Sequence, residues 1–256
     1  MSGQVVSPSS AQCENCHARR HGPCASLPAA SLARFAEAAR PVDYPAGHCF
    51  WDEDGRVNFV GILKTGYLRM LRYTADGRRQ IMALVGPGDI VGEGFRPVAG
   101  YRLEASTPAT MCRFEPAVFE RLLEREPELR RAVCRDYLDQ LDGLRRTTWS
   151  LGVQSPRERL CAFLSLSCRT MPFAPSPKGG GLLTLELPRA DIADLLGTTK
   201  ETISRLTHRL QSSGLLRIRD PRRFFIPDLA RLERAGGLNP PQTARVKAAQ
   251  PQRCEA

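Results

Sequence analysis

Three cysteines and two histidines lie within twelve residues near the N-terminus. The stretch CENCHARRHGPC carries Cys13, Cys16 and Cys24, with His17 and His21 between them. Thiolate and imidazole ligands at this spacing can hold zinc, and the three cysteines with His21 would form a complete four-ligand set. The same residues can also hold an iron–sulfur cluster, form a redox dithiol, or attach haem through the C-x-x-C-H motif. This stretch alone leaves all four chemistries open.

The other cysteines are dispersed along a chain of 256 residues, of which 42% are hydrophobic. The opening MSGQVVSPSSAQ lacks the apolar core of a signal peptide, and no apolar run approaches the ~18 residues of a membrane span. We therefore expect a cytoplasmic protein with no membrane association. In that reducing compartment, clustered cysteines indicate metal ligation or redox chemistry rather than disulfides. Four dispersed cysteines are expected to act as small core side chains: Cys49, Cys134, Cys161 and Cys168.

Positive charge is concentrated in the C-terminal half of the chain. The net charge is +10; residues 1–150 carry 20 Lys or Arg against 18 Asp or Glu, whereas residues 151–256 carry 17 against 9. Such a basic half is typical of proteins that bind a polyanion, most often nucleic acid. A basic surface that is merely solvated is the alternative that charge alone leaves open.

Short apolar runs separated by glycines occupy residues 42–114. Runs such as VNFVGILKTGYLRMLRY and RRQIMALVG are typical of a compact antiparallel barrel or roll. The Asp76-Gly77 pair between two of these runs predicts a hairpin. A short helix that ends before Pro41 is expected to precede the roll.

A long helix is expected after the roll, with Pro127 in its first turn. Four apolar residues recur along it at three- and four-residue spacing: Val133, Tyr137, Leu141 and Leu144. A narrow apolar seam on a charged helix is typical of a two-stranded coiled-coil contact, so we expect a homodimer. Packing of the same stripe on the chain's own roll is the alternative.

Two helical segments separated by residues 196–198 form the most specific motif in the chain. In LPRADIADLLGTTKETISRLTHRLQSSGLLRI, Gly197 lets the backbone turn, and Thr198 or Thr199 can cap the second helix. This arrangement predicts a helix-turn-helix. Upstream, Ser155 with Glu158 predicts the start of another helix, and the loop PFAPSPKGGG is expected to be a linker.

The second helix of this motif has an exposed face suited to reading bases. Its buried stripe leaves Glu201, Ser204, Arg205 and His208 outward, and Glu, Ser and Arg can hydrogen-bond to cytosine or guanine edges. The basic segment SSGLLRIRDPRRFFIPD predicts a wing whose arginines contact phosphates. Seven residues are expected at the DNA: Thr198, Thr199, Lys200, Glu201, Ser204, Arg205 and His208.

In this order of elements the chain resembles the Crp/Fnr family of bacterial transcription regulators over nearly its full length. The segment ETISRLTHRLQSSGLL resembles the recognition helix of the Fnr branch, which uses a Glu, a Ser and an Arg to read inverted repeats of TTGAT half-sites; here these are Glu201, Ser204 and Arg205. The resemblance implies a homodimer on double-stranded DNA. It also implies contact with RNA polymerase through the turn at residues 74–79, for which a plain hairpin is the alternative.

The resemblance also bears on the cysteine stretch. Fnr-type members carry an oxygen-labile 4Fe-4S cluster on three N-terminal cysteines and one cysteine of the roll. The implied ligands are Cys13, Cys16, Cys24 and Cys112. Zinc is the alternative, because the basic, histidine-rich HARRHGP between the second and third cysteines departs from the family pattern.

Cyclic-nucleotide-binding members of the family hold the ligand's phosphate with an Arg-Ser pair in the roll. An ungapped count back from Ala105 places Ala99 and Gly100 at those positions. We therefore expect no cyclic nucleotide.

The expected fold is α+β: an N-terminal antiparallel β-roll, like the jelly roll of cyclic-nucleotide-binding domains, a long dimerisation helix and a C-terminal winged helix-turn-helix. Five segments are expected: a cysteine-bearing arm (1–30), the β-roll sensor domain (31–126), the dimerisation helix (127–149), the DNA-binding domain (150–230) and a disordered tail (231–256). No Ser/His/Asp arrangement, phosphate loop or paired carboxylates point to catalysis, so we expect no enzyme. The predicted function, which the resemblance implies, is an oxygen-responsive transcription regulator that activates or represses. Its 4Fe-4S cluster is expected to promote dimerisation and binding to TTGAT-N4-ATCAA-like sites under low oxygen. The alternative is a regulator of the same fold with a structural zinc or another redox- or nitric-oxide-sensing cysteine site.

Overall fold

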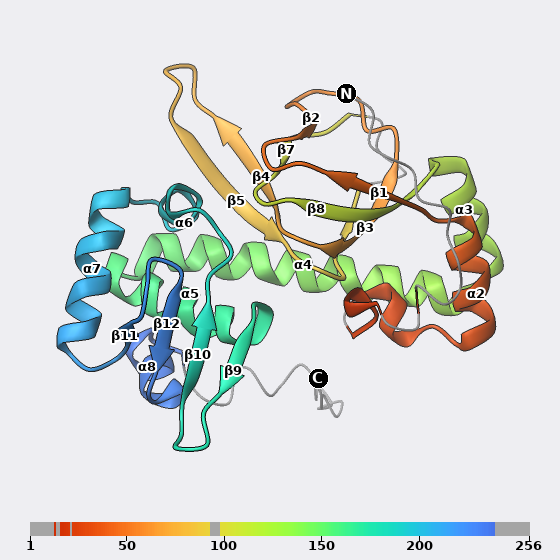
Figure 1. The fold of residues 1–256 in the computed structure, drawn as a ribbon. Helices are drawn as coiled ribbons and strands as arrows, with labels where there is room; N and C mark the ends of the chain where they lie inside the picture. Colours follow the sequence, from red (N-terminus) through yellow and green to blue (C-terminus); the bar gives the residue numbers. More distant parts are fainter. Residues whose placement is uncertain (1–12, 14–15, 21, 93–97, 239–256) are drawn as a thin grey trace, which may run out of the picture. The chain divides into compact units, whose positions relative to one another are not determined.

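The computed structural model describes residues 13, 16–20, 22–92 and 98–238. The chain divides into two compact units, Met1–Thr148 with Leu187–Leu195, and Trp149–Glu186 with Leu196–Ala256 (Figure 1). Within the described residues, no helix is both long and apolar enough to cross a membrane.

Eight strands of the first unit build the predicted antiparallel roll. They form two four-stranded sheets, in the orders β1-β8-β3-β6 and β2-β7-β4-β5. The strands are β1 (Arg40–Tyr44), β2 (Cys49–Trp51), β3 (Val60–Thr65), β4 (Leu68–Tyr73), β5 (Arg79–Val85), β6 (Ile90–Val91), β7 (Arg102–Ala105) and β8 (Ala109–Phe114).

Both sheets contribute side chains to one buried cluster. Leu63 and Met111 come from the first sheet, and Leu68 and Leu103 from the second. Burial of each such side chain contributes about 1.5–3 kcal/mol to folding. Gly61 leaves room for Met111, because a Cβ at position 61 would lie 2.1 Å from the Met111 sulfur and that side chain would have to move.

The predicted hairpin at Asp76-Gly77 joins β4 to β5. Thr74 donates its backbone N–H to the Arg78 carbonyl at 2.9 Å, and Gly77 adopts a φ of 83°. Glycine takes this left-handed conformation without a steric penalty.

Two helices, α2 (Ala29–Ala38) and α3 (Pro116–Arg125), enclose a second apolar cluster. Phe35 of α2 stacks on Phe114 of β8, with ring centroids 4.5 Å apart, and Phe119 of α3 packs against both rings. The expected short helix therefore forms, and Pro41 already lies in strand β1.

The long helix α4 (Pro127–Val153) begins at Pro127 as predicted. Its first turns pack on the roll, which corrects the expected dimer seam at that end. Val133 is only 4% exposed and belongs to the same cluster as Phe35, and Tyr137 packs against that cluster. Only Leu141 and Leu144 of the four predicted residues remain exposed.

The second unit begins its fold with α5 (Pro156–Thr170), which has the predicted capping box. Ser155 accepts a hydrogen bond from the Glu158 N–H, and Glu158 accepts one from the Ser155 N–H. The other elements of the winged helix-turn-helix segment are β9 (Phe173–Pro175), β10 (Gly181–Thr184), α6 (Arg189–Leu195), α7 (Lys200–Ser212), β11 (Arg217–Ile218), β12 (Arg223–Ile226) and α8 (Leu229–Ala235). Of these, α6 belongs to the first unit.

Two segment predictions are wrong. The expected linker at PFAPSPKGGG instead contains β9 and the first residue of β10, because Gly181 pairs with Pro175 and Ile226 in a sheet of order β11-β12-β10-β9. The expected disordered tail from 231 begins inside helix α8, which Asp228 caps by accepting from the Arg231 N–H. The remainder from residue 239 lies outside the described residues.

The dispersed cysteines divide into two kinds. Cys161 and Cys168 are buried, as predicted for small core side chains. Cys49 and Cys134 are exposed, so that prediction is wrong for them: apolar neighbours in sequence do not fix which face of a strand or helix a side chain occupies.

Candidate functional site

The four cysteines predicted as ligands line one cavity in the first unit. The space among these residues is about 390 Å³, a value that includes open solvent at the mouth of the cavity. Its walls comprise Cys13, Cys16, Cys24 and Cys112, the side chains of Arg19 and Lys64, and the apolar residues Ala18, Leu32, Phe35, Ala36, Ala39, Ile62 and Phe114. Residues almost one hundred positions apart in the sequence thus meet at one site.

Two short 3-10 helices, η1 (His17–Arg20) and η2 (Pro23–Ser26), follow Cys13 and Cys16, and Cys24 lies in η2. Gly22 between them has a φ of 64°, and a Cβ there would lie 1.8 Å from the Gly88 carbonyl oxygen. The arm therefore approaches the roll so closely that only glycine fits.

Cys112 enters the cavity from strand β8, at the centre of its sheet. It lies opposite Pro41 of β1 and Ile62 of β3 in the strand register. Since β8 is hydrogen-bonded on both sides, this thiol is fixed by the roll, whereas the other three belong to the arm.

Burial suppresses ionisation of three of these thiols, those of Cys13, Cys24 and Cys112. Burial, followed by the neighbouring Cys112, raises the pKa of Cys24 to about 12, and burial raises the pKa of Cys112 to the same value. Burial also raises the pKa of Cys13, an effect that Lys64 and Arg19 oppose. These three thiols therefore hold their protons in a mostly apolar cavity unless a metal replaces them.

Within the described part of the chain, no three His, Cys, Asp or Glu side chains form a group arranged for a metal ion. The histidines of the arm cannot be placed: His21 and the side chain of His17 lie outside the described residues.

The predicted recognition helix is α7. Thr199 is its N-cap, with its hydroxyl accepting from the Thr202 N–H at 3.2 Å, and Ile203, Leu206 and Leu210 form its buried stripe. Its opposite face exposes the predicted base-reading side chains Glu201, Ser204, Arg205 and His208; Thr199 and Lys200 are also exposed, and Thr198 is half-buried.

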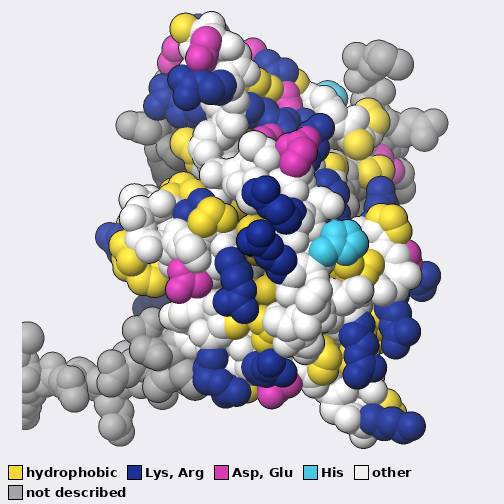
Figure 2. Space-filling view, turned by 90° about the vertical axis from the view of Figure 1, so that its left-hand side faces the viewer, with side chains coloured by type: hydrophobic (Ala, Val, Ile, Leu, Met, Phe, Trp, Pro, Cys, Tyr) yellow, Lys and Arg dark blue, Asp and Glu magenta, His cyan; other side chains and the backbone are white. Residues whose placement is uncertain are grey.

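The wing provides a basic flank. Arg217 of β11 and Arg219 each place the guanidinium carbon 5.9 Å from the centroid of the Phe225 ring, and Asp220 pairs with Arg223 across the turn. Figure 2 shows the side on which α7 lies, and Lys and Arg side chains gather on this face. Such a surface suits phosphate contacts.

Comparisons with known proteins agree with both halves of this geometry. The model of the cyclic nucleotide-binding domain matches residues 41–126, and that of the Crp-like helix-turn-helix domain matches residues 158–235. The transcriptional activator protein FnrL of Cereibacter sphaeroides is 31% identical over 229 residues, covering 88% of this chain and 92% of FnrL. The chain belongs to the Crp/Fnr family of transcription regulators.

Two further relatives support this assignment. The nitrogen fixation regulation protein FixK of Bradyrhizobium diazoefficiens is 34% identical, over 84% of this chain and 90% of FixK. The structure of FixK2 from Bradyrhizobium japonicum superposes with a TM-score of 0.70 at 25% identity, over 77% of this chain and 96% of that one. The chain is thus a DNA-binding transcription regulator of a non-enzymatic family. This confirms the predicted fold and the prediction that the protein is not an enzyme.

In this Crp/Fnr regulator, the exposed part of α4 forms an apolar patch. Leu138, Leu141 and Leu144 are 61%, 41% and 38% exposed. We define these three residues as the α4 patch. Leu138 was missed from the sequence because it falls outside the stripe that Val133 and Tyr137 begin, and those two residues face the roll.

The ungapped count places Ala99 and Gly100 at the positions of the phosphate-binding pair, and neither residue carries a side-chain donor. Ala99 is buried in the core cluster. The nearest arginine in strand β7, Arg102, instead donates to Glu104 and Asp52.

A buried arginine that sequence reasoning missed supports the turn before α7. Arg159 of α5 donates from Nε to the Leu196 carbonyl at 2.8 Å and from Nη1 to the Gln154 carbonyl at 2.6 Å. It satisfies backbone acceptors at the end of one helix and near the start of another. In sequence, Arg159 resembles any charged residue of an amphipathic helix.

Proposed function

We propose that this regulator responds to oxygen through a 4Fe-4S cluster held by Cys13, Cys16, Cys24 and Cys112. The observation that carries the proposal is the single cavity that these four thiols line. A 4Fe-4S cluster takes one thiolate at each iron, so its ligands must be spread around a space of this kind. When bound, the cluster supplies an oxygen-labile covalent link between the arm and the roll.

Two cations in the cavity wall suit an anionic group. Lys64 of β3 and Arg19 of η1 line the cavity, and their charges favour the thiolate forms of nearby cysteines. Because four thiolates bring more negative charge than the iron–sulfide core offsets, these two side chains would balance part of the excess.

A route from the cysteines to α4 runs through the core. Cys24 and Cys112 pack against the apolar cluster that contains Leu129 and Val133 of α4. A cluster that holds the arm against the roll would therefore stabilise the packing of α4 on the roll and the position of the α4 patch. We propose that two copies dimerise through this patch.

For DNA, we propose that Glu201, Ser204 and Arg205 read TTGAT half-sites. Their exposure on α7 supports this, with Lys200 and His208 beside them and Thr198 and Thr199 at the helix start. A symmetric dimer would place two α7 helices on an inverted repeat of TTGAT-N4-ATCAA type.

The hairpin turn at residues 74–79 is a proposed contact with RNA polymerase. Its Asp76 and Arg78 side chains are exposed and paired with each other.

Zinc on the arm's cysteines remains the second candidate for the metal, favoured by the short C-x-x-C spacing. We propose no cyclic-nucleotide effector, because Ala99 and Gly100 offer no side-chain donor to a phosphate.

The test is metal analysis of protein purified without oxygen. Wild-type protein should contain about four irons and four sulfides per chain and absorb near 400 nm. Cys112→Ala should lose most of both, whereas the matched control Cys49→Ala, an exposed cysteine outside the cavity, should not. Stoichiometric zinc without sulfide, or full iron and sulfide in Cys112→Ala, would overturn the ligand assignment.

A further inference from the structure

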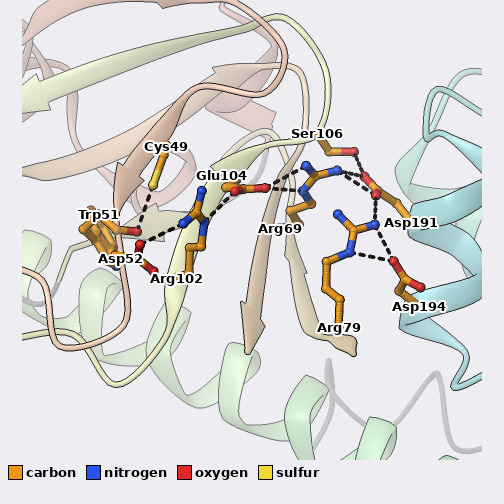
Figure 3. Close-up of polar contacts among 10 residues, drawn as sticks. All are labelled: Cys49, Trp51, Asp52, Arg69, Arg79, Arg102, Glu104, Ser106, Asp191 and Asp194. Atoms are coloured by element: carbon orange, nitrogen blue, oxygen red, sulfur yellow. Dashed lines mark hydrogen bonds and ion pairs between the residues drawn. The ribbon is translucent and has the colours of Figure 1, made fainter. Parts of the chain in front are cut away.

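The helix-turn-helix is divided between the two compact units. Helix α6, its first helix, belongs with the roll and lies against strand β5, whereas α7 belongs to the second unit. Charged side chains of two strands, Arg69 of β4 and Arg79 of β5, converge on α6 (Figure 3).

Asp191 of α6 is the centre of this convergence. It is only 1% exposed, and both its carboxylate oxygens accept from Arg69 Nη1 at 2.7 Å. It also accepts from the Ser106 hydroxyl at 2.5 Å and from Arg79 Nη2 at 2.9 Å. A buried carboxylate with this many charged and hydroxyl donors is held in one position.

A second contact lies one helical turn away. Asp194 accepts from Arg79 Nε at 2.7 Å, and its backbone carbonyl accepts from Gln80 Nε2 at 2.6 Å. Arg79 and Gln80 begin strand β5, so α6 is attached to this strand at both Asp191 and Asp194.

The arginine beneath Asp191 is itself fixed by the sheet. Arg69 of β4 lies opposite Glu104 of β7 in the register and donates to it from Nε at 3.0 Å and Nη2 at 2.7 Å. Glu104 is 6% exposed and also accepts from Arg102, which reaches Asp52 at the exposed end. We call this chain of residues the α6 latch: Asp52, Arg69, Arg79, Arg102, Glu104, Ser106, Asp191 and Asp194.

The latch resists displacement of α6. If α6 moved away from the sheet, Asp191 and Arg69 would each lose a buried partner of opposite charge, which is costly in a low-dielectric interior. The interaction is also directional, because Arg69 donates to Asp191 and Glu104 at once. The roll therefore determines where α6 lies.

From this geometry we propose that Asp191 is a positioning residue for DNA recognition. The proposal rests on the proposed role of α7 as the base-reading helix. Because α7 begins at Lys200, five residues after α6 ends at Leu195, restricting α6 restricts where α7 can start. When the position of α7 is already restricted, less conformational freedom is lost as the dimer binds two half-sites together. The latch therefore increases the affinity for the operator.

The test compares full-length Asp191→Asn with the control Glu53→Gln. The control removes an ion pair with Arg72 of the same sheet that does not involve α6. The two readouts are amide hydrogen exchange in α6 without DNA, and affinity for a TTGAT-N4-ATCAA duplex at equal folded fraction and iron content. We expect Asp191→Asn to exchange at least tenfold faster in α6 and to bind the duplex at least tenfold more weakly, with both values unchanged in Glu53→Gln.

A milder pair of variants covers the case in which Asp191→Asn does not fold. Asp194 and Arg79 are partly exposed, so Asp194→Asn and Arg79→Gln should fold. Each variant should bind the duplex about threefold more weakly than wild type. The loss of affinity in the double variant should be smaller than the product of the two single losses. Unchanged exchange in α6 would overturn the latch, and unchanged or tighter DNA binding would overturn its role in recognition.

These outcomes are separable from failure of the proposed operator. If wild-type protein does not prefer TTGAT to a scrambled duplex, the proposed sequence preference is wrong. Hydrogen exchange then still tests the latch, and affinity for any duplex at low salt tests its effect on binding.

Discussion

The carboxylate of Asp136 on α4 accepts a hydrogen bond from the backbone N–H of Ile90 on β6, at 3.3 Å. Gln140, one turn further along α4, donates from Nε2 to the same carboxylate oxygen at 2.7 Å and to the Ile90 carbonyl at 3.0 Å. Polar contacts thus join α4 to the roll beside its apolar contacts, and they place a buried carboxylate next to Asp89.

This junction predicts a pH dependence of stability. Burial raises the pKa of Asp136 to about 6 and that of Asp89 to about 7. Since both values exceed those of the unfolded chain, which lie near 4, the folded state binds more protons, and the contribution of these groups to stability falls as pH rises from about 4 to 7. Asp136→Asn should therefore gain about 2–3 kcal/mol relative to wild type across this range, measured by urea unfolding.

The control for this prediction is Asp142→Asn, which alters an exposed carboxylate of the same helix. Its difference from wild type should not change with pH. A pH-independent difference for Asp136→Asn would contradict the assignment.

The α4 patch predicts the effect of a charge on dimerisation. Leu141→Glu should weaken self-association at least about tenfold, because it places a carboxylate in an apolar contact. Arg146→Ala, on the other side of the helix, should have little effect. Analytical ultracentrifugation measures both, and an unaltered dimer in Leu141→Glu would show that the patch is not the interface.

Base reading by α7 predicts a loss of discrimination. Arg205→Ala and Glu201→Ala should each reduce the preference for TTGAT over a duplex with its G·C pair replaced, by roughly 10- to 100-fold. Arg222→Ala, in the wing, should instead weaken binding to both duplexes alike and reduce the salt dependence. Competition binding with the two duplexes decides, and undiminished preference in both α7 variants would argue against this helix as the reader.

Lys64 predicts a change in oxygen sensitivity. Replacement by Met removes a positive charge from the cavity wall and should make the bound cluster easier to oxidise, because the net charge around a cluster sets its potential. We expect the absorbance near 400 nm to fade in air at least about threefold faster in Lys64→Met and at about the wild-type rate in Lys64→Arg. Equal fading rates in wild type, Lys64→Met and Lys64→Arg would show that Lys64 does not affect oxidation of the cluster.

Local sequence patterns predicted much of this molecule because their causes are local. The Asp76-Gly77 turn, the Ser155–Glu158 capping box and the Thr199 cap each depend on residues a few positions apart. The cysteine cavity required the resemblance to a family, since no spacing rule connects Cys24 to Cys112.

Contacts between distant segments could not be predicted from the sequence. Val133 and Leu141 have the same periodicity, and only the packing of α4 on the roll distinguishes the buried one from the exposed one. Arg69 and Asp191 are separated by 121 intervening residues, and nothing near either indicates its partner. Gly181 shows another consequence of distant contacts. The glycine-rich run that contains it suggests a linker, but Gly181 pairs in a sheet.

Oxygen-dependent DNA binding is the central claim, and the most direct measurement is operator affinity before and after air exposure. Protein purified without oxygen is titrated onto a TTGAT-N4-ATCAA duplex, exposed to air until the absorbance near 400 nm is lost, and titrated again. The account predicts affinity at least about tenfold lower after exposure, together with loss of iron and sulfide. Equal affinity in the two titrations, with the iron and sulfide gone, would contradict it.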